Sequence, residues 1–114
     1  MSVTDRQARA ILARDGFRCV YCLASVDVGL SIDHVTPQVW FRDGEAAGDP
    51  DVSANLVSAC LDCNSLKRDM DLETFCVYLS RRWPSRWTEE RIAAMVTRVR
   101  AALSRPTGAP ENTP

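Results

Sequence analysis

Apolar residues recur with helical spacing in three parts of the chain. The first is Thr4–Arg14, where Thr4 and Gln7 have the spacing of a capping box. The second is Leu72–Arg82, which stops before a Trp-Pro pair, and the third begins after Thr88, a residue type that caps helices. The apolar residues that would form the buried stripes of the three helices are Ala8, Ile11, Leu12, Leu72, Phe75, Cys76, Leu79, Ile92, Met95, Val96, Val99 and Leu103.

Shorter apolar runs in the middle of the chain predict a small β-structure. We expect Leu23–Val28 and Leu30–Val35 to form the two strands of a hairpin. A third apolar run, Asn55–Ala59, comes later, and a short helix is expected at Cys63–Arg68. Because strands in the middle are flanked by helices at both ends, the pattern predicts an α+β domain.

A long connection separates the expected hairpin from the third apolar run. It spans Pro37–Ser53 and contains an acidic, glycine-rich piece, Asp43–Asp51. Connections of this length without structure of their own are usually functional or mobile. Its aromatic pair, Trp40 and Phe41, is expected to pack on the core, because large aromatic side chains usually gain most from burial. Stacking on nucleic-acid bases is the less favoured alternative for this pair.

Four of the five cysteines are arranged in two pairs with the same C-x-x-C spacing. The pairs are Cys19 with Cys22 and Cys60 with Cys63. Two such turns can direct four thiolates at one ion, and a closed set of four sulfurs is what structural Zn²⁺ prefers. A redox-active C-x-x-C or a pair of disulfides would use the same residues and remain as alternatives. The fifth cysteine, Cys76, lies in a helical apolar pattern and is expected to be a small buried hydrophobe.

The whole chain has the size and composition of one ordinary domain. It has 114 residues, of which 46% are hydrophobic and 25% charged, and no apolar run is long enough to span a membrane. We expect a single domain over residues 1–105 and a disordered, polar, proline-containing tail over 106–114. Since residues 1–16 contain no secretory-type apolar run, we expect a cytoplasmic protein, encoded by a bacterium or a phage.

Charge is distributed unevenly along the chain. The net charge is −1, with 5 basic and 8 acidic residues in 1–57 (−3) and 9 basic and 7 acidic residues in 58–114 (+2). Phosphate neutralisation normally dominates nucleic-acid affinity. Any binding to a nucleic acid is therefore expected to be weak or to depend on a partner.

Polar residues beside the two cysteine pairs have the chemistry of a second site. Asp33 offers the hard oxygen ligand that Mg²⁺ or Mn²⁺ takes, and its neighbour His34, the only histidine, can accept a proton from water near neutral pH. Asn64 directly follows the last cysteine of the set. Lys67 and Arg68, three and four residues later, lie on the same helical face and are expected to hold a phosphate there.

Taken together, the order of these residues resembles the HNH endonucleases. More narrowly, it is similar to a zinc-stapled branch in which the third motif residue is asparagine. The resemblance covers about residues 14–70, and the helical part 71–105 follows it. The segments that carry it are Phe17-Arg18-Cys19-x-x-Cys22, Ile32-Asp33-His34-Val35-x-Pro37, Asn55-Leu56-Val57 and Cys60-x-x-Cys63-Asn64-x-x-Lys67.

The resemblance implies a fold, a reaction and a role for each site residue. The fold is the ββα-metal motif, a hairpin followed by a helix with one divalent ion between them. His34 would be the general base, Asp33 and Asn64 would hold Mg²⁺, Mn²⁺ or Ni²⁺, and Asn55 would fix the hairpin loop and the orientation of His34. The implied reaction cleaves double-stranded DNA to 5′-phosphate and 3′-hydroxyl ends. One such centre cuts one strand, so a monomer would nick, and a homodimer or a protein partner would be needed to cut both strands.

Two alternatives to catalysis and one geometric difficulty remain at this point. The chain can also be read as a zinc-stabilised nucleic-acid-binding module, or as an adaptor that docks a protein partner on its C-terminal helices. The difficulty is that Asp33 and His34 are neighbours, and neighbours on a regular strand point to opposite faces. Both face one site only if the strand ends or bulges there.

Overall fold

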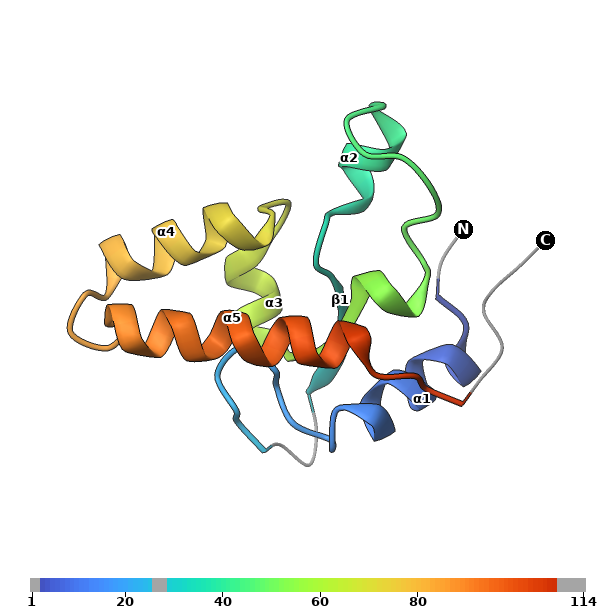
Figure 1. The fold of residues 1–114 in the computed structure, drawn as a ribbon, viewed down its shortest axis with the longest axis horizontal. Coiled ribbons are helices and arrows are strands. Elements are labelled where there is room, and N and C mark those ends of the chain that lie inside the picture. The colour runs from blue at the N-terminus through green and yellow to red at the C-terminus, as the bar shows by residue number, and fades with distance from the viewer. Residues whose placement is uncertain (1–2, 26–28, 109–114) are drawn as a thin grey trace.

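The computed structural model describes residues 3–25 and 29–108, which form two strands and five α-helices around one core (Figure 1). This confirms the expected α+β class. None of these helices combines the length and the apolar character needed to cross a membrane. In chain order the elements are α1 (Asp5–Arg14), β1 (Leu30–His34), α2 (Gln38–Arg42), the 3₁₀ turn η1 (Ser53–Asn55), β2 (Leu56–Cys60), α3 (Leu61–Lys67), α4 (Leu72–Arg82) and α5 (Glu89–Ser104).

The three helices expected from apolar spacing all form, and side chains define where they start. Thr4, Asp71 and Thr88 each accept a hydrogen bond from the backbone N–H three residues on, at 3.1, 2.9 and 3.3 Å. These N-caps satisfy donors that the first helical turn leaves unpaired. The Asp71 carboxylate also gains a lowered pKa from its bonds to Thr74, since hydrogen bonds favour its charged form.

The sheet pairs different strands from those expected. β1 and β2 run antiparallel, in a register from Leu30 opposite Cys60 to His34 opposite Leu56. The expected hairpin partner of β1 was therefore wrong: Ser25 forms only an isolated bridge with Arg18, and residues 26–28 lie outside the described part of the chain.

Local backbone geometry explains why the segment before β1 does not extend into a strand there. The N–H of Cys19 bonds the carbonyl of Ala24 at 3.0 Å, and the N–H of Leu23 bonds the carbonyl of Cys19 at 2.8 Å. Leu23 also has a φ of +66°, which is far from extended backbone. The Leu23 N–H and the Ala24 carbonyl are thus bonded within the first C-x-x-C turn and cannot pair with β1.

The two faces of the sheet are covered by different helices. On one face, the Ser58 hydroxyl donates to the carbonyl of Ile11 in α1 at 3.4 Å. On the other face, Val57 and Ala59 belong to a core that α4 and α5 complete. Figure 1 shows α4 and α5 lying side by side on the same flank of the molecule. The other members of that core are Cys19, Val20, Tyr21, Val35, Cys60, Cys63, Phe75, Leu79, Trp87, Met95, Val99 and Ala102.

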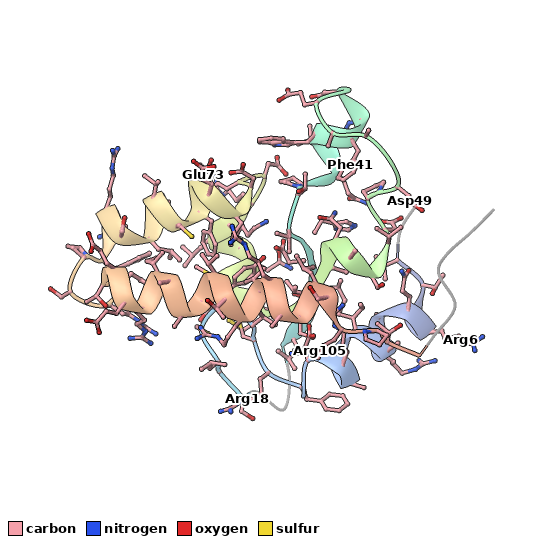
Figure 2. The ribbon with its side chains drawn as sticks, in the orientation of Figure 1. Arg6, Arg18, Phe41, Asp49, Glu73 and Arg105 are labelled. Atoms are coloured by element: carbon pink, nitrogen blue, oxygen red, sulfur yellow. The ribbon has the colours of Figure 1, made fainter. Side chains whose placement is uncertain are left out.

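The connection between β1 and β2 forms an arm that carries α2 away from the rest of the fold (Figures 1 and 2). No residue of α2 is buried, so Trp40 and Phe41 do not pack on the core as expected. The arm is instead closed on itself, because the carbonyl of Trp40 accepts the N–H groups of Glu45 and Ala46 at 2.8 and 3.0 Å. It returns to the sheet near Asp51 and η1.

Candidate functional site

The four paired cysteines come together as the spacing predicts. Their sulfur atoms all lie within 4.8 Å of one another, and the sulfurs of Cys22 and Cys60 are 3.8 Å apart. Four sulfurs bound tetrahedrally at the usual Zn–S distance of about 2.3 Å would stand about 3.8 Å apart. The cluster therefore has both the donor chemistry and the spacing that hold zinc. All five cysteines are free thiols, so the structure contains no disulfide among them.

The thiols of this cluster differ in acidity because they lie against one another and are partly desolvated. Hydrogen bonding with the Cys63 thiol lowers the pKa of Cys19 to about 5, while the same bond raises the pKa of Cys63. Desolvation raises the pKa of Cys22 to about 11. Neighbouring thiolates repel one another, so without an ion one sulfur ionises at the expense of the rest. A bound divalent ion would offset the repulsion between the thiolates, because it favours the deprotonated form of every ligand.

A half-buried arginine connects the first cysteine turn to the C-terminal helix. Arg98 in α5 donates its Nε to the carbonyl of Val20 at 3.1 Å and its Nη2 to the carbonyl of Tyr21 at 2.9 Å. These carbonyls lie between Cys19 and Cys22, so α5 holds the turn from outside. The helical part after residue 70 thereby supports the metal-binding geometry.

Asp33 lies in a buried polar network on the core-facing side of β1. Its Oδ2 accepts a hydrogen bond from the Tyr21 hydroxyl at 2.5 Å and lies 3.0 Å from the Lys67 ammonium. Burial, followed by the Asp33 charge, raises the pKa of Tyr21, which keeps that hydroxyl protonated as a donor. Both contacts, taken over the described residues, fall on Oδ2, so Oδ1 is the Asp33 oxygen that could bind a cation.

Lys67 has an internal role in this structure. Its side chain is fully buried, and its Nζ donates to the carbonyls of His34 and Val35 at 3.0 and 3.1 Å in addition to pairing with Asp33. The ammonium therefore does not reach the surface where the expected phosphate contact would be made. The next residue, Arg68, is exposed and remains the candidate for that contact.

Replacing Lys67 with methionine is expected to destabilise the fold by about 3–5 kcal/mol, because the Asp33 carboxylate would remain buried without its counter-ion. Arg68→Met is the matched control: it removes the same charge from an exposed position and is expected to change stability by less than about 0.5 kcal/mol. Chemical denaturation followed by circular dichroism measures both. Equal stabilities of the two variants would contradict the buried ion pair.

His34 is the last residue of β1, and its ring is held by an acidic residue from the returning arm. The His34 Nε2 lies 2.7 Å from Oδ1 of Asp51, whose side chain is 2% exposed, against 18% for His34. The imidazole thus keeps access to solvent while its partner does not. Among the described residues, this is the one hydrogen bond found for the histidine ring.

The side chains of Asp33 and His34 point to opposite faces of the sheet. The β1–β2 register is regular through His34, with no bulge, so the alternation of a strand applies to both residues. Asp33 accordingly meets Lys67 of α3, and His34 meets Asp51 on the face covered by α1. Of the two conditions under which both side chains could face one site, the bulge is absent, and the other is met because β1 ends at His34.

Asn64 is placed on the same side of the sheet as Asp33. Its Nδ2 donates to the hydroxyl of Ser31 at 2.8 Å, and Ser31 is two residues before Asp33 on β1. Lys67, one helical turn further along α3, contacts Asp33 itself. With the amide nitrogen bound to Ser31, the Asn64 amide oxygen and Asp33 Oδ1 are two hard oxygen donors on one face, which suits Mg²⁺ or Mn²⁺ chemically.

Asn55 forms hydrogen bonds with both ends of the arm. Its Oδ1 accepts the N–H of Thr36 at 2.8 Å, and its Nδ2 donates to the carbonyls of Thr36 and Pro50, each at 3.0 Å. Thr36 is two residues after His34, and Pro50 is directly before Asp51. One buried amide therefore fixes the distance between the segments that carry the imidazole and its carboxylate partner.

This constellation lies within a segment that matches a known family. Residues 19–69 match the family model of the HNH endonucleases. This segment is an HNH domain. The resemblance inferred from the motifs is thus confirmed for the family, and the match indicates a nuclease-type function. A comparison with curated proteins gives no significant match.

Sequence reasoning missed two residues of the HNH domain. Tyr21 is an unassigned position of the Cys19-x-x-Cys22 motif, although its hydroxyl donates to Asp33. Asp51 was read as one more acid in a charged loop. Its position in the sequence, four residues before Asn55, could have indicated its role. If Asn55 fixes the loop, the residues just before it must lie close to those after His34.

Proposed function

We propose that the chain is a metal-dependent DNA endonuclease that hydrolyses phosphodiester bonds to 5′-phosphate and 3′-hydroxyl ends. The observation that carries the proposal is His34: the only imidazole of the chain stands partly exposed at the end of β1, inside the HNH domain, with one ring nitrogen bound by a buried carboxylate. An imidazole held in this way keeps a second ring nitrogen and access to solvent, both of which a general base needs.

Each side chain has a proposed task in the reaction. His34 takes a proton from the water that attacks the scissile phosphate. Asp33 and Asn64 would hold the catalytic ion, Mg²⁺, Mn²⁺ or Ni²⁺, through their side-chain oxygens. When bound, that ion supplies positive charge to stabilise the transition state and the leaving 3′-oxygen. Asn55 keeps the arm closed so that the imidazole stays in place.

The substrate is proposed to be double-stranded DNA, met first by the exposed guanidinium of Arg68 at the end of α3. The chain carries only one HNH domain among its described residues, so we propose that it nicks one strand as a monomer. A homodimer or a protein partner would supply the second cut. We further propose that it acts in the cytoplasm of a bacterial cell, where zinc thiolates stay reduced.

Incubating supercoiled plasmid with the purified, zinc-loaded protein tests this proposal. We expect conversion to the open circular form with Mg²⁺, Mn²⁺ or Ni²⁺, little linear product at early times, and none of this in EDTA. The nicks should be sealed by DNA ligase without prior treatment, because the ends are a 5′-phosphate and a 3′-hydroxyl. Plasmid that stays supercoiled with all three metals, while the protein remains folded and zinc-bound, would end the endonuclease assignment.

A second candidate function is a zinc-stabilised module that binds a nucleic acid or a protein without cutting. It is favoured by two observations: the Lys67 ammonium already neutralises Asp33, and His34 points to the other face. The salt dependence of DNA binding distinguishes a nucleic-acid-binding module from a protein adaptor. Affinity for DNA that falls steeply between low and physiological salt, without cleavage, would identify a nucleic-acid-binding module, and absence of DNA binding at any salt would identify a protein adaptor.

A further inference from the structure

We propose that Asp51 is a positioning residue of the active site: its buried carboxylate holds the Nε2–H of His34, so that Nδ1 is the nitrogen that accepts the proton of the attacking water. This inference rests on the proposed endonuclease function for its kinetic part. The geometric part stands on the 2.7 Å separation of His34 Nε2 and Asp51 Oδ1.

Asp51 is held from several sides, which a surface acid of a charged loop would not be. The residue is 1% exposed. Its N–H donates to Oδ1 of Asp49 at 2.9 Å, and its carbonyl accepts Nε2 of Gln7 from α1 at 2.5 Å. Gln38 at the start of α2 places an amide nitrogen 3.5 Å from the same Oδ1 that meets His34. The carboxylate is thus fixed relative to both the sheet and α1.

Burying a carboxylate is unfavourable unless donors satisfy it. Of the two side-chain donors to Asp51 Oδ1, the imidazole is the closer, at 2.7 Å against 3.5 Å for the Gln38 amide. A carboxylate at neutral pH can only accept hydrogen bonds, so the proton of the neutral imidazole must be on Nε2. The other nitrogen, Nδ1, is then left with its lone pair available.

The same contact helps the reaction when the proton arrives. Once Nδ1 has taken the proton from water, the ring is an imidazolium beside a negative carboxylate. Asp51 stabilises that charge at a site that water reaches only on the His34 side, where an ion pair is stronger than in bulk water. The residue therefore acts through His34 on both the tautomer of the base and the energy of its protonated form, and touches no reacting atom itself.

The single histidine makes the geometric part directly measurable. Nitrogen-15 chemical shifts of the histidine ring, recorded on the full zinc-loaded chain at a pH where the ring is neutral, report one imidazole only. We expect the Nε2–H tautomer to dominate in the wild type and to lose that dominance in Asp51→Ala. A wild-type ring mainly in the Nδ1–H form would overturn the proposal, whether or not the protein cuts DNA.

Kinetics of plasmid nicking measure the functional part. Asp51→Asn is expected to lower kcat by about 10- to 100-fold with KM nearly unchanged, because substrate contacts are not removed. Asp51→Glu, which restores a carboxylate, should recover part of the loss. The matched control is Asp43→Asn, which removes one charge from an exposed position of the same arm and is expected to keep the wild-type rate.

The outcomes separate this inference from the proposed function. Wild-type protein that never nicks DNA but shows the Nε2–H tautomer would refute the endonuclease and keep the Asp51–His34 pair. Nicking by Asp51→Asn at the rate of Asp43→Asn would refute the positioning role and keep the endonuclease. If the Asp51 variants do not fold, which melting curves and zinc content reveal, the wild-type tautomer alone decides.

Discussion

Replacing Cys60 with serine is expected to strip the protein of its zinc and to unfold the HNH domain. Cys60 contributes more than one ligand: it ends β2, and its sulfur accepts the N–H of Cys63 as the N-cap of α3. Structural zinc contributes on the order of 10 kcal/mol in small domains, more than the total stability of many of them. Metal analysis and thermal unfolding followed by circular dichroism measure the two losses.

Cys76→Ser is the matched control for that variant. It makes the same chemical change at a half-buried cysteine in α4, outside the four-sulfur cluster. We expect it to keep one zinc per chain and to cost about 1 kcal/mol, the usual effect of a single substitution. Chelation of the wild-type protein should reproduce the melting curve of Cys60→Ser. Equal melting temperatures of the two serine variants would show that the four sulfurs do not hold a structural ion.

The second large effect is expected from His34→Ala, which should lower plasmid nicking by about 10²- to 10⁴-fold, the range that general-base catalysis contributes. Zinc binding should be unaffected, because the ring has no contact with the four sulfurs. A moderate loss of stability, about 1–3 kcal/mol, is expected as well, since Asp51 would remain buried without its donor. The rate should therefore be measured at a temperature where zinc content and circular dichroism match the wild type.

His34→Gln distinguishes loss of the base from loss of the Asp51 contact. A glutamine amide can donate to Asp51 but cannot accept a proton at neutral pH. We expect this variant to regain much of the stability lost in His34→Ala while remaining as inactive. Nicking at the wild-type rate by either variant would remove His34 from its role as general base.

The helices of this protein could be predicted from sequence because their signals are local. Apolar spacing and the N-caps at Thr4 and Thr88 lie within a few residues of the elements that they define. α4 was placed at its observed bounds, Leu72–Arg82, because a Trp-Pro pair stops it. The four-cysteine site followed in the same way, since each C-x-x-C turn is local and only two such turns had to meet.

The sheet was predicted less well because strand pairing depends on distant residues. Leu23–Val28 and Leu56–Cys60 are both apolar and short, and nothing near β1 says which of them is its partner. The choice is made by burial: all five residues of β2 are buried between α1 and the main core. The burial of Trp40 and Phe41 was mispredicted for the same reason, since the arm places α2 outside the core.

What the sequence by itself determined was the inventory of the HNH domain: two cysteine turns for zinc, an Asp-His pair at a strand, and the asparagines at 55 and 64. The tertiary structure decided how that inventory is used. It put Asp33 and His34 on opposite faces, buried Lys67 against Asp33, and brought Asp51 to the imidazole from 17 residues away. Residue types and short spacings are local properties of a chain, whereas the partner of a buried charge is set by the elements that enclose it.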